Sequence, residues 1–244
     1  MNENYGAEYA SLYAEHWWWR SRESMIVDVI RRLNVPVPTT VLDVGCGDAV
    51  AFPALSQFGT VVGIEIDRSL VSEGNPHTKM IHHEPLGDPV YRGRQFGLIT
   101  ALDVIEHIKD DRQAVADMVD MLIPGGILVV TVPAFMSLWD KHDVINHHFR
   151  RYTSRQVLDL LTPHGDVLQV GYFFHSLYFL KRCVKVINMF RPGSVVQHAV
   201  PAGFVNRFMR RLCVQEYRWC RRLSVPFGSS VVGVLRRREG SGEI

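Results

Sequence analysis

The chain has 244 residues, of which 47% are hydrophobic, and a formal net charge of only +2. This length supports one α/β domain with a sizeable core, and the small net charge excludes a field that would recruit nucleic acid. Its four cysteines show neither metal-type pairing nor a dense disulfide pattern, so we expect no metal site and a reducing, cytoplasmic location. We expect no secretory signal, because residues 1–5 lack a basic, apolar pattern, and no transmembrane helix, because no apolar run reaches the roughly 20 residues required.

The spacing of apolar residues predicts alternating helices and strands. Residues 21–33 have helical periodicity, and Pro36 and Pro38 are expected to end that helix before the first strand. Strands and helices then alternate to about residue 174, as a parallel doubly wound sheet requires.

The second half of the chain contains a clear helix start and two further strands. Thr153 and Gln156 have the spacing of a capping box, which predicts a helix over residues 153–161. Residues 166–174 are then expected to form the sixth strand and residues 228–235 the last one.

Residues 41–49 break from an apolar strand into a turn in which one residue separates Gly45 from Gly47. Glycines at the carboxyl end of a parallel strand allow a sharp turn and let backbone N–H groups approach a ligand. A second apolar strand ends at Glu65, 22 residues after Asp43, which is the spacing of one βαβ unit. A carboxylate at that position can accept hydrogen bonds from a ribose diol. The pattern predicts a nucleotide-type cofactor, and an ordinary βα turn with a solvated acid is the alternative.

The residues after this turn separate two cofactor classes. The dinucleotide fingerprint G-x-G-x-x-G requires a glycine where this chain has Val50. Asp48 would repel a pyrophosphate, whereas it suits a sulfonium ligand that carries an α-ammonium group. We therefore predict an S-adenosylmethionine site.

Two further segments resemble motifs of the class I S-adenosylmethionine-dependent methyltransferases. Residues 96–108 are similar to the fourth strand of that family and the helix start after it. Residues 122–133 are similar to its Pro-Gly-Gly turn into the fifth strand. The family usually has an aspartate where this chain has Gly97, a departure that weakens one structural contact and does not touch the cofactor site.

Other segments are similar to one bacterial subgroup of small-molecule methyltransferases, so that the resemblance covers nearly the whole chain. They are residues 16–22, 138–143, 148–152 and 225–234. The resemblance implies a Rossmann-like, doubly wound, seven-stranded sheet that is mostly parallel. Its last strand would be antiparallel between the fifth and sixth strands, after a helical insertion.

The expected organisation is a single methyltransferase domain with five parts. These are an N-terminal helical lid (1–38), a cofactor-binding core (39–174), a helical cap insertion (175–223), the last strand (224–237) and a disordered tail (238–244).

The resemblance places the cofactor at the carboxyl edge of the sheet. Backbone groups from Gly45 to Gly47 would hold the methionine portion, Glu65 the ribose and Ile66 the adenine face. Asp103 would lie beside the sulfonium or, as an equal alternative, cap the following helix. The predicted cofactor-binding residues are Asp43, Gly45, Cys46, Gly47, Glu65, Ile66, Glu84, Leu86, Asp103, Val104 and Arg22.

The tryptophans at positions 17–19 have two interpretations. They could form a lid over the cofactor, with Arg22 near its carboxylate, or fill the space beneath their own helix.

Methyl transfer to a hydroxyl or an acidic carbon needs a base, a task that suits histidine near neutral pH. The candidates are His107 after the fourth strand and a histidine cluster after the fifth. We favour His148 or His142 as the base, with Asp143 orienting an imidazole. The alternative is that these residues tie their loop to the arginines at 150 and 151.

Residues 175–223 carry two basic, apolar helical segments separated by residues 191–193. The first segment could lie on a membrane surface, line an apolar substrate or pack on a second subunit. Packing on its own sheet, with a solvated basic face, is the alternative. Peripheral membrane contact and a homodimer are therefore both compatible with the sequence.

These observations predict an S-adenosylmethionine-dependent methyltransferase that acts on a small, hydrophobic molecule. An NAD-type oxidoreductase and a non-catalytic S-adenosylmethionine-binding interaction protein are the alternatives. The sequence identifies neither the acceptor nor the atom methylated, whether oxygen, nitrogen or carbon.

Overall fold

The computed structural model describes residues 12–33, 35, 39–190 and 200–239. Within these residues, seven strands form one mixed sheet in the order β3-β2-β1-β4-β5-β7-β6. The pairs among β1 to β5 are parallel, and β7 lies antiparallel between β5 and β6. This order confirms the predicted Rossmann-like sheet and the place of its last strand. The strands are β1 (Thr39–Val44), β2 (Gly59–Ile64), β3 (Ile81–His82), β4 (Phe96–Leu102), β5 (Leu122–Pro133), β6 (Asp166–Phe173) and β7 (Ser230–Arg236).

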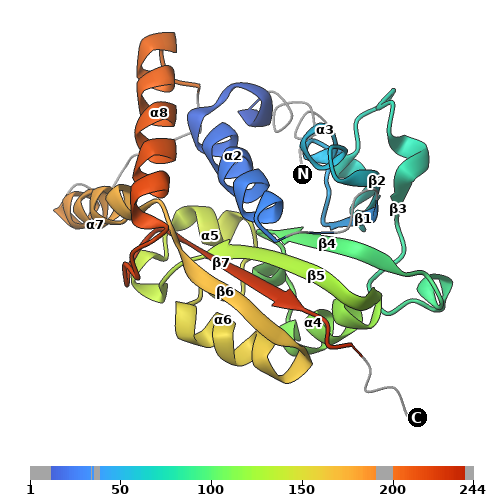
Figure 1. The fold of residues 1–244 in the computed structure, drawn as a ribbon. Helices are drawn as coiled ribbons and strands as arrows, with labels where there is room; N and C mark the ends of the chain where they lie inside the picture. Colours follow the sequence, from blue (N-terminus) through green and yellow to red (C-terminus); the bar gives the residue numbers. More distant parts are fainter. Residues whose placement is uncertain (1–11, 34, 36–38, 191–199, 240–244) are drawn as a thin grey trace.

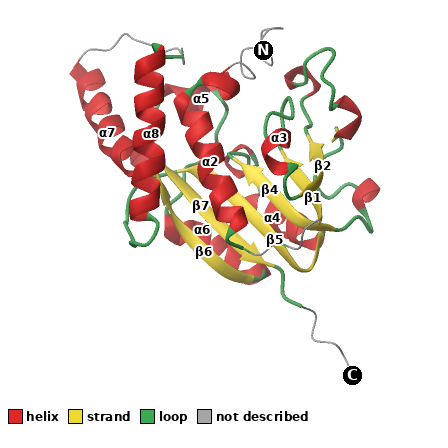
Figure 2. Ribbon diagram, turned by 45° about the horizontal axis from the view of Figure 1, so that its top comes forward, coloured by secondary structure: helices red, strands yellow, loops and turns green. Residues whose placement is uncertain are grey.

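Helices cover both faces of this sheet. Those of the described residues are α2 (Trp17–Arg31), α3 (Phe52–Leu55), α4 (Asp111–Asp120), α5 (Lys141–Ile145), α6 (Ser154–Leu161), α7 (His175–Phe190) and α8 (Gly203–Cys220). Figure 1 shows α2 and α8 on one side of the sheet and α4 and α6 on the other. Figure 2 gives the same arrangement from a second direction.

The side chains of β5 alternate between two apolar clusters, one on each face of the sheet. Val129 belongs to the cluster that contains Met25 and Ile26 of α2. Leu128 and Val130 belong to the cluster formed with α4 and α6. Because both faces are covered, the strand is continuously apolar. Each fully buried side chain of this kind contributes about 1.5–3 kcal/mol.

Helix α2 begins earlier than the predicted start at residue 21, because a side chain caps it. His16 Nδ1 accepts a hydrogen bond from Trp18 N at 3.1 Å, which satisfies one free N–H group of the first turn. The capping box predicted for the later helix is confirmed in α6. Thr153 Oγ1 accepts from Gln156 N at 3.3 Å, and Thr153 N donates to Gln156 Oε1 at 2.8 Å.

Several predicted features lie outside the described residues and stay predictions. They are Pro36 and Pro38, residues 191–193, residues 1–11 of the lid and residues 240–244 of the tail.

The predicted helical insertion forms α7 and α8, and α8 packs against α2. Asn206 Oδ1 accepts from Trp17 N at 2.7 Å, and Tyr217 OH donates to Asp28 Oδ2 at 2.8 Å. The Cys213 side chain is buried in the same core cluster. One insertion helix therefore belongs to the core of the domain. Among the described residues, none of the helices combines the length and apolar content needed to cross a bilayer.

The structure shows what surrounds Gly97, where the resemblance implies an aspartate. A Cβ atom at Gly97 would lie 1.9 Å from Thr39 Oγ1, on the strand next to β4. The Thr39 hydroxyl therefore occupies the space that any side chain would need.

Replacing Gly97 with Ala should lower the free energy of unfolding by about 1–3 kcal/mol, because the new methyl group overlaps Thr39 Oγ1. Urea denaturation followed by circular dichroism measures this loss. Thr39→Ala in the same chain should recover most of it. Simple additivity of the two single effects in a double-mutant cycle would contradict the explanation.

Candidate active site

The Gly-x-Gly turn leaves the carboxyl end of β1 and contacts the end of β2. Gly45 and Gly47 have φ angles of 65° and 52°, in the left-handed region that favours glycine. Gly45 N and Cys46 N both donate to Ile64 O, at 2.8 and 3.1 Å. A Cβ on Gly47 would meet no atom within 4 Å. Hydrogen bonds to Ile64 therefore fix the start of the turn, whereas the space beside Gly47 is open.

Glu65 lies directly after β2, where its carboxylate is bonded to the same turn. Its Oε2 accepts from Gly47 N at 3.0 Å, and its Oε1 accepts from Asp67 N at 2.9 Å. Burial raises the pKa of this carboxyl group, and the two N–H donors oppose the rise. Each oxygen keeps a further lone pair for a ligand. The next side chain, Ile66, is apolar and 66% exposed, as expected of a surface that a ring could cover.

Asp43 lies on β1, two residues before Gly45. It is buried and accepts a hydrogen bond from Thr100 Oγ1 at 2.6 Å. Burial raises its pKa to about 6, although the Thr100 hydroxyl and the charge of Arg22 oppose the rise. Asp48 also has a structural role, and its effect on the choice of cofactor stays a prediction. Its carboxylate accepts from Ser72 N at 2.8 Å and Ser72 Oγ at 2.7 Å, so it anchors the loop after β2.

The segment after β3 approaches the same edge of the sheet. Glu84 O accepts from Tyr91 OH at 2.9 Å, and Leu86 is half-buried. His83, which the sequence did not single out, donates from Nδ1 to Glu65 O at 2.6 Å. Glu84 and Leu86 thus follow the strand next to β2, and their contact with the cofactor stays a prediction.

Asp103 follows β4 and joins it to α2. It has a φ angle of 60°, and its carboxylate forms an ion pair with Arg22 and accepts from Thr131 Oγ1 at 3.3 Å. Asp103 does not cap the following helix. That role belongs to Asp110, which accepts from Gln113 N at 3.0 Å at the start of α4.

Arg22 and the aromatic side chains before it pack into the domain. Arg22 is 4% exposed, and its guanidinium lies 5.1 Å from the centre of the Trp18 ring. Trp18 stacks on Phe174, and Trp19 is buried in the core cluster. These contacts support the space-filling interpretation of the tryptophans. Val104 directly follows Asp103 in the sequence. Its Cγ2 atom lies 2.6 Å from the position that a Cβ atom on Gly45 would take.

The histidine candidates come from two loops that meet at the carboxyl edge. His107 ends a short 3-10 turn (Ile105–His107), rather than lying on a helix as expected. Its ring centre is 4.5 Å from that of His148, and the two rings are perpendicular. His148 Nδ1 donates to Asp143 Oδ1 at 2.8 Å. His142 is exposed on α5, with its ring centre 6.2 Å from that of His148.

Asp143 performs both of the tasks considered for it. Besides holding His148, it accepts from Arg151 Nε and Nη2, each at 2.8 Å, and from Asp140 N at 2.8 Å. Although burial opposes it, these hydrogen bonds hold the pKa of Asp143 well below its ordinary value. The carboxylate therefore orients an imidazole and fastens the loop to Arg151. Arg150 pairs instead with Asp111 at 2.7 Å.

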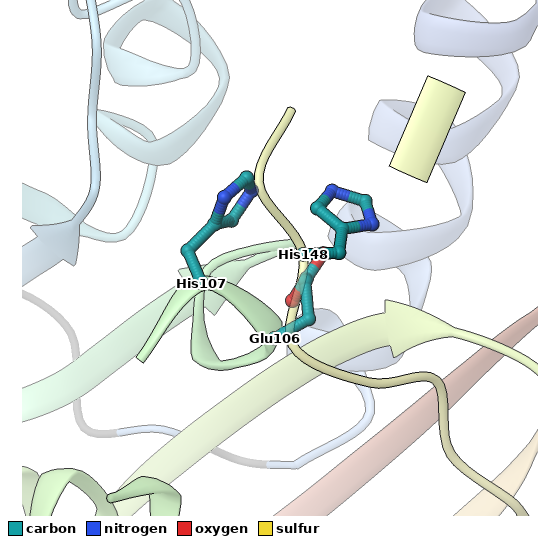
Figure 3. Close-up of side chains that lie close together, drawn as sticks. All are labelled: Glu106, His107 and His148. Carbon is teal, nitrogen blue, oxygen red and sulfur yellow. The ribbon is translucent and has the colours of Figure 1, made fainter. Parts of the chain in front are cut away.

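Glu106 is the site residue that the sequence did not identify. It is fully buried, and among the described residues neither of its carboxylate oxygens has a hydrogen-bond partner. Burial raises its pKa to about 8. Burial and the neighbouring His148 lower the pKa of His107 to about 4. Figure 3 shows Glu106, His107 and His148 gathered at one place. The available signal was an acid inside an apolar segment, directly before a histidine.

This site lies where strands of a doubly wound sheet bind ligands, and comparison with known proteins gives the class. The model of a family described as "Methyltransferase domain" matches residues 18–181, so the chain belongs to this family. A ubiquinone biosynthesis O-methyltransferase of Coxiella burnetii is 23% identical over an alignment of 151 residues, and the match covers 55% of this chain. The chain spans 59% of the length of that relative.

Two solved structures share the fold. The Haloferax volcanii protein solved with the Trm112 methyltransferase activator has a TM-score of 0.62 at 14% identity, covering 96% of this chain and 95% of that one. The N-methyltransferase NodS of Bradyrhizobium japonicum, solved with S-adenosyl-L-homocysteine, has a TM-score of 0.54 at 15% identity. The match covers 94% of this chain and 91% of NodS.

Replacing Asp143 with Ala should destabilise the protein by about 3–5 kcal/mol, because the buried Arg151 guanidinium then lacks its partner. Chemical denaturation measures the change. The matched control is Asp166→Ala, whose partner Arg238 is 59% exposed and whose loss should cost less than about 1 kcal/mol. Equal losses in the two variants would contradict a structural role for the buried pair.

Proposed function

We propose that the protein is an S-adenosylmethionine-dependent methyltransferase whose acceptor is a small, hydrophobic molecule. The observation that carries this proposal is the hydrogen bond from Gly47 N to Glu65 Oε2 beside an open glycine. It joins the turn that would hold the methionine portion to the carboxylate that would hold the ribose. The family match supports methyl transfer over NAD-type redox chemistry. A cytoplasmic location belongs to the same proposal.

The described residues fit S-adenosylmethionine without rearrangement of the turn. Gly47 leaves space where a side chain would stand, and Glu65 keeps free lone pairs. Ile66 presents an uncovered apolar side chain next to that carboxylate. Arg22 uses one amino group for Asp103, so its remaining N–H donors could still meet a ligand carboxylate.

When bound, this cofactor supplies a methyl group whose carbon bonds to the acceptor as the carbon–sulfur bond breaks and its electron pair stays on sulfur. The chain's own residues align the acceptor and remove its proton. Alignment can supply about 7–11 kcal/mol of barrier reduction in ideal cases. The name of the Coxiella burnetii relative makes oxygen the acceptor atom that we favour. A hydroxyl acceptor then loses its proton to the cluster of His107 and His148.

Glu65→Gln should weaken the binding of S-adenosylhomocysteine tenfold or more, because a hydrogen bond to a charged acceptor is worth about 1.5–3 kcal/mol. Isothermal titration calorimetry measures the affinity. The exposed Glu73→Gln variant is the control and should bind like the parent protein. NAD should not bind. Tighter binding of NAD than of S-adenosylhomocysteine would overturn the proposed function.

We also propose that α8 contacts an anionic membrane surface from which a hydrophobic acceptor is drawn. Phe204, Phe208 and Leu212 form an exposed apolar stripe at helical spacing, with exposed fractions of 71%, 63% and 40%. Arg207 and Arg211 are exposed beside this stripe. Apolar side chains next to basic ones are typical of helices that lie in a lipid interface. The charge of the arginines favours anionic lipid over a second copy of the same basic helix.

The protein should therefore sediment with vesicles that contain phosphatidylglycerol, and much less with pure phosphatidylcholine. Phe204→Ser with Phe208→Ser should reduce this binding at least fivefold. Phe149→Ser, which removes an exposed phenylalanine outside α8, is the control. If the double variant instead converts a dimer to a monomer and leaves vesicle binding unchanged, the helix is a subunit interface and the membrane proposal fails.

A further inference from the structure

We propose that Glu106, His107 and His148 form a binding site for a divalent transition-metal ion of the Zn²⁺ type. No metal site was expected from the sequence, because the cysteines lack metal-type spacing. The ligands come instead from residues that are far apart in the chain and that the fold brings together.

The geometry of the three side chains suits one ion. Each offers a ligand atom, and these atoms all lie within 4.8 Å of one another. Bonds of about 2.0–2.2 Å to a shared ion would place them about 3.4 Å apart, so ion binding would draw the three side chains closer together. Two imidazole nitrogens and one carboxylate oxygen are a ligand set used by Zn²⁺ and by Fe²⁺. Mg²⁺ prefers sites made of oxygen ligands alone.

His148 is already held as metal ligands usually are, by a hydrogen bond on one ring nitrogen. His148 Nδ1 donates to Asp143 Oδ1 at 2.8 Å, which leaves Nε2 to bind an ion. The His107 ring lies edge-on against the ring of His148, with the two centres 4.5 Å apart. The two loops are also fastened together, since Phe149 N donates to Glu106 O at 2.8 Å. The two loops that carry the three ligands are therefore already held together without an ion.

The buried carboxyl group of Glu106 indicates that a ligand binds here. Its side chain is 0% exposed, and both oxygens lack a hydrogen-bond partner among the described residues. A buried polar group without a partner costs about 1–3 kcal/mol, and more when it is charged. A bound ion would satisfy the carboxylate directly. His107 is accessible to solvent, so an ion has a path to the site.

The two arginines near Glu106 already have acidic partners. Arg22 is paired with Asp103, and Arg151 is paired with Asp143. Burial favours the protonated form of Glu106, and a bound cation would instead favour the ionised carboxylate that serves as a ligand.

The role of the ion rests on the proposed function. Three protein ligands leave at least one position open, and an acceptor oxygen could occupy it. An ion lowers the pKa of a bound hydroxyl, whose proton can then leave to water. His148 would serve as a ligand in this arrangement and no longer as a free base. The acceptor class that follows is a small molecule with a hydroxyl group that can bind a metal, aromatic hydroxyls included.

The test uses the full chain after removal of metal with a chelator. We expect it to bind one equivalent of Zn²⁺ in calorimetry and to give a visible absorption band with Co²⁺. Glu106→Gln keeps the shape of the buried side chain, and it should weaken Zn²⁺ binding at least tenfold. His148→Ala should do the same. His142→Ala removes a neighbouring exposed histidine outside the cluster and should retain the parental Zn²⁺ affinity.

Binding of Zn²⁺ with parental affinity by both Glu106→Gln and His148→Ala would overturn the proposal, as would the absence of saturable binding to the parent chain. An equal loss in His142→Ala would place the ion on the surface and also overturn it. Titration with S-adenosylhomocysteine is run on every variant. If the parent chain binds Zn²⁺ but does not bind S-adenosylhomocysteine, the methyltransferase function is refuted and the proposed ion site is not.

Discussion

The close approach of three chain segments at Gly45 is the constraint on which the active site depends. A Cβ atom there would lie 2.6 Å from Val104 Cγ2, so the turn after β1 can reach the segment after β4 only if position 45 is glycine. The same turn bonds to Ile64 O at the end of β2. Carboxyl ends of neighbouring parallel strands are always near one another. The contacts of this turn also hold the loops after β1, β2 and β4 together.

Buried carboxylates then differ in function because they differ in their partners. Glu65 is satisfied by two backbone N–H groups and Asp143 by an arginine and a histidine. Asp43 has the Thr100 hydroxyl. Glu106 has no such partner among the residues described, although it lies in the same layer of the fold. The acid without a partner is the one placed for a ligand.

The sheet and the glycine turn could be predicted because their signals are local. Apolar strands, the Gly45-x-Gly47 spacing and the Thr153 capping box each depend on a few consecutive residues. Glu106 could not be recognised in this way, since its environment is made by the loop around His148, some forty residues later. The bond from Ser72 to Asp48 could not be recognised for the same reason, because Ser72 lies beyond β2.

The contact between α2 and α8 joins segments that are far apart in the sequence, since Trp17 and Asn206 are separated by 189 positions. During synthesis, α2 therefore meets this partner only after the whole sheet except β7 has been made. Contacts of such large sequence separation are formed late, because the cost of closing a long loop precedes their benefit. Arg22, whose ion pair with Asp103 joins α2 to the end of β4, lies on the helix that this late contact secures. A chain truncated before α8 would therefore keep β1 to β4 and lose the contacts of α8 that hold α2 in place.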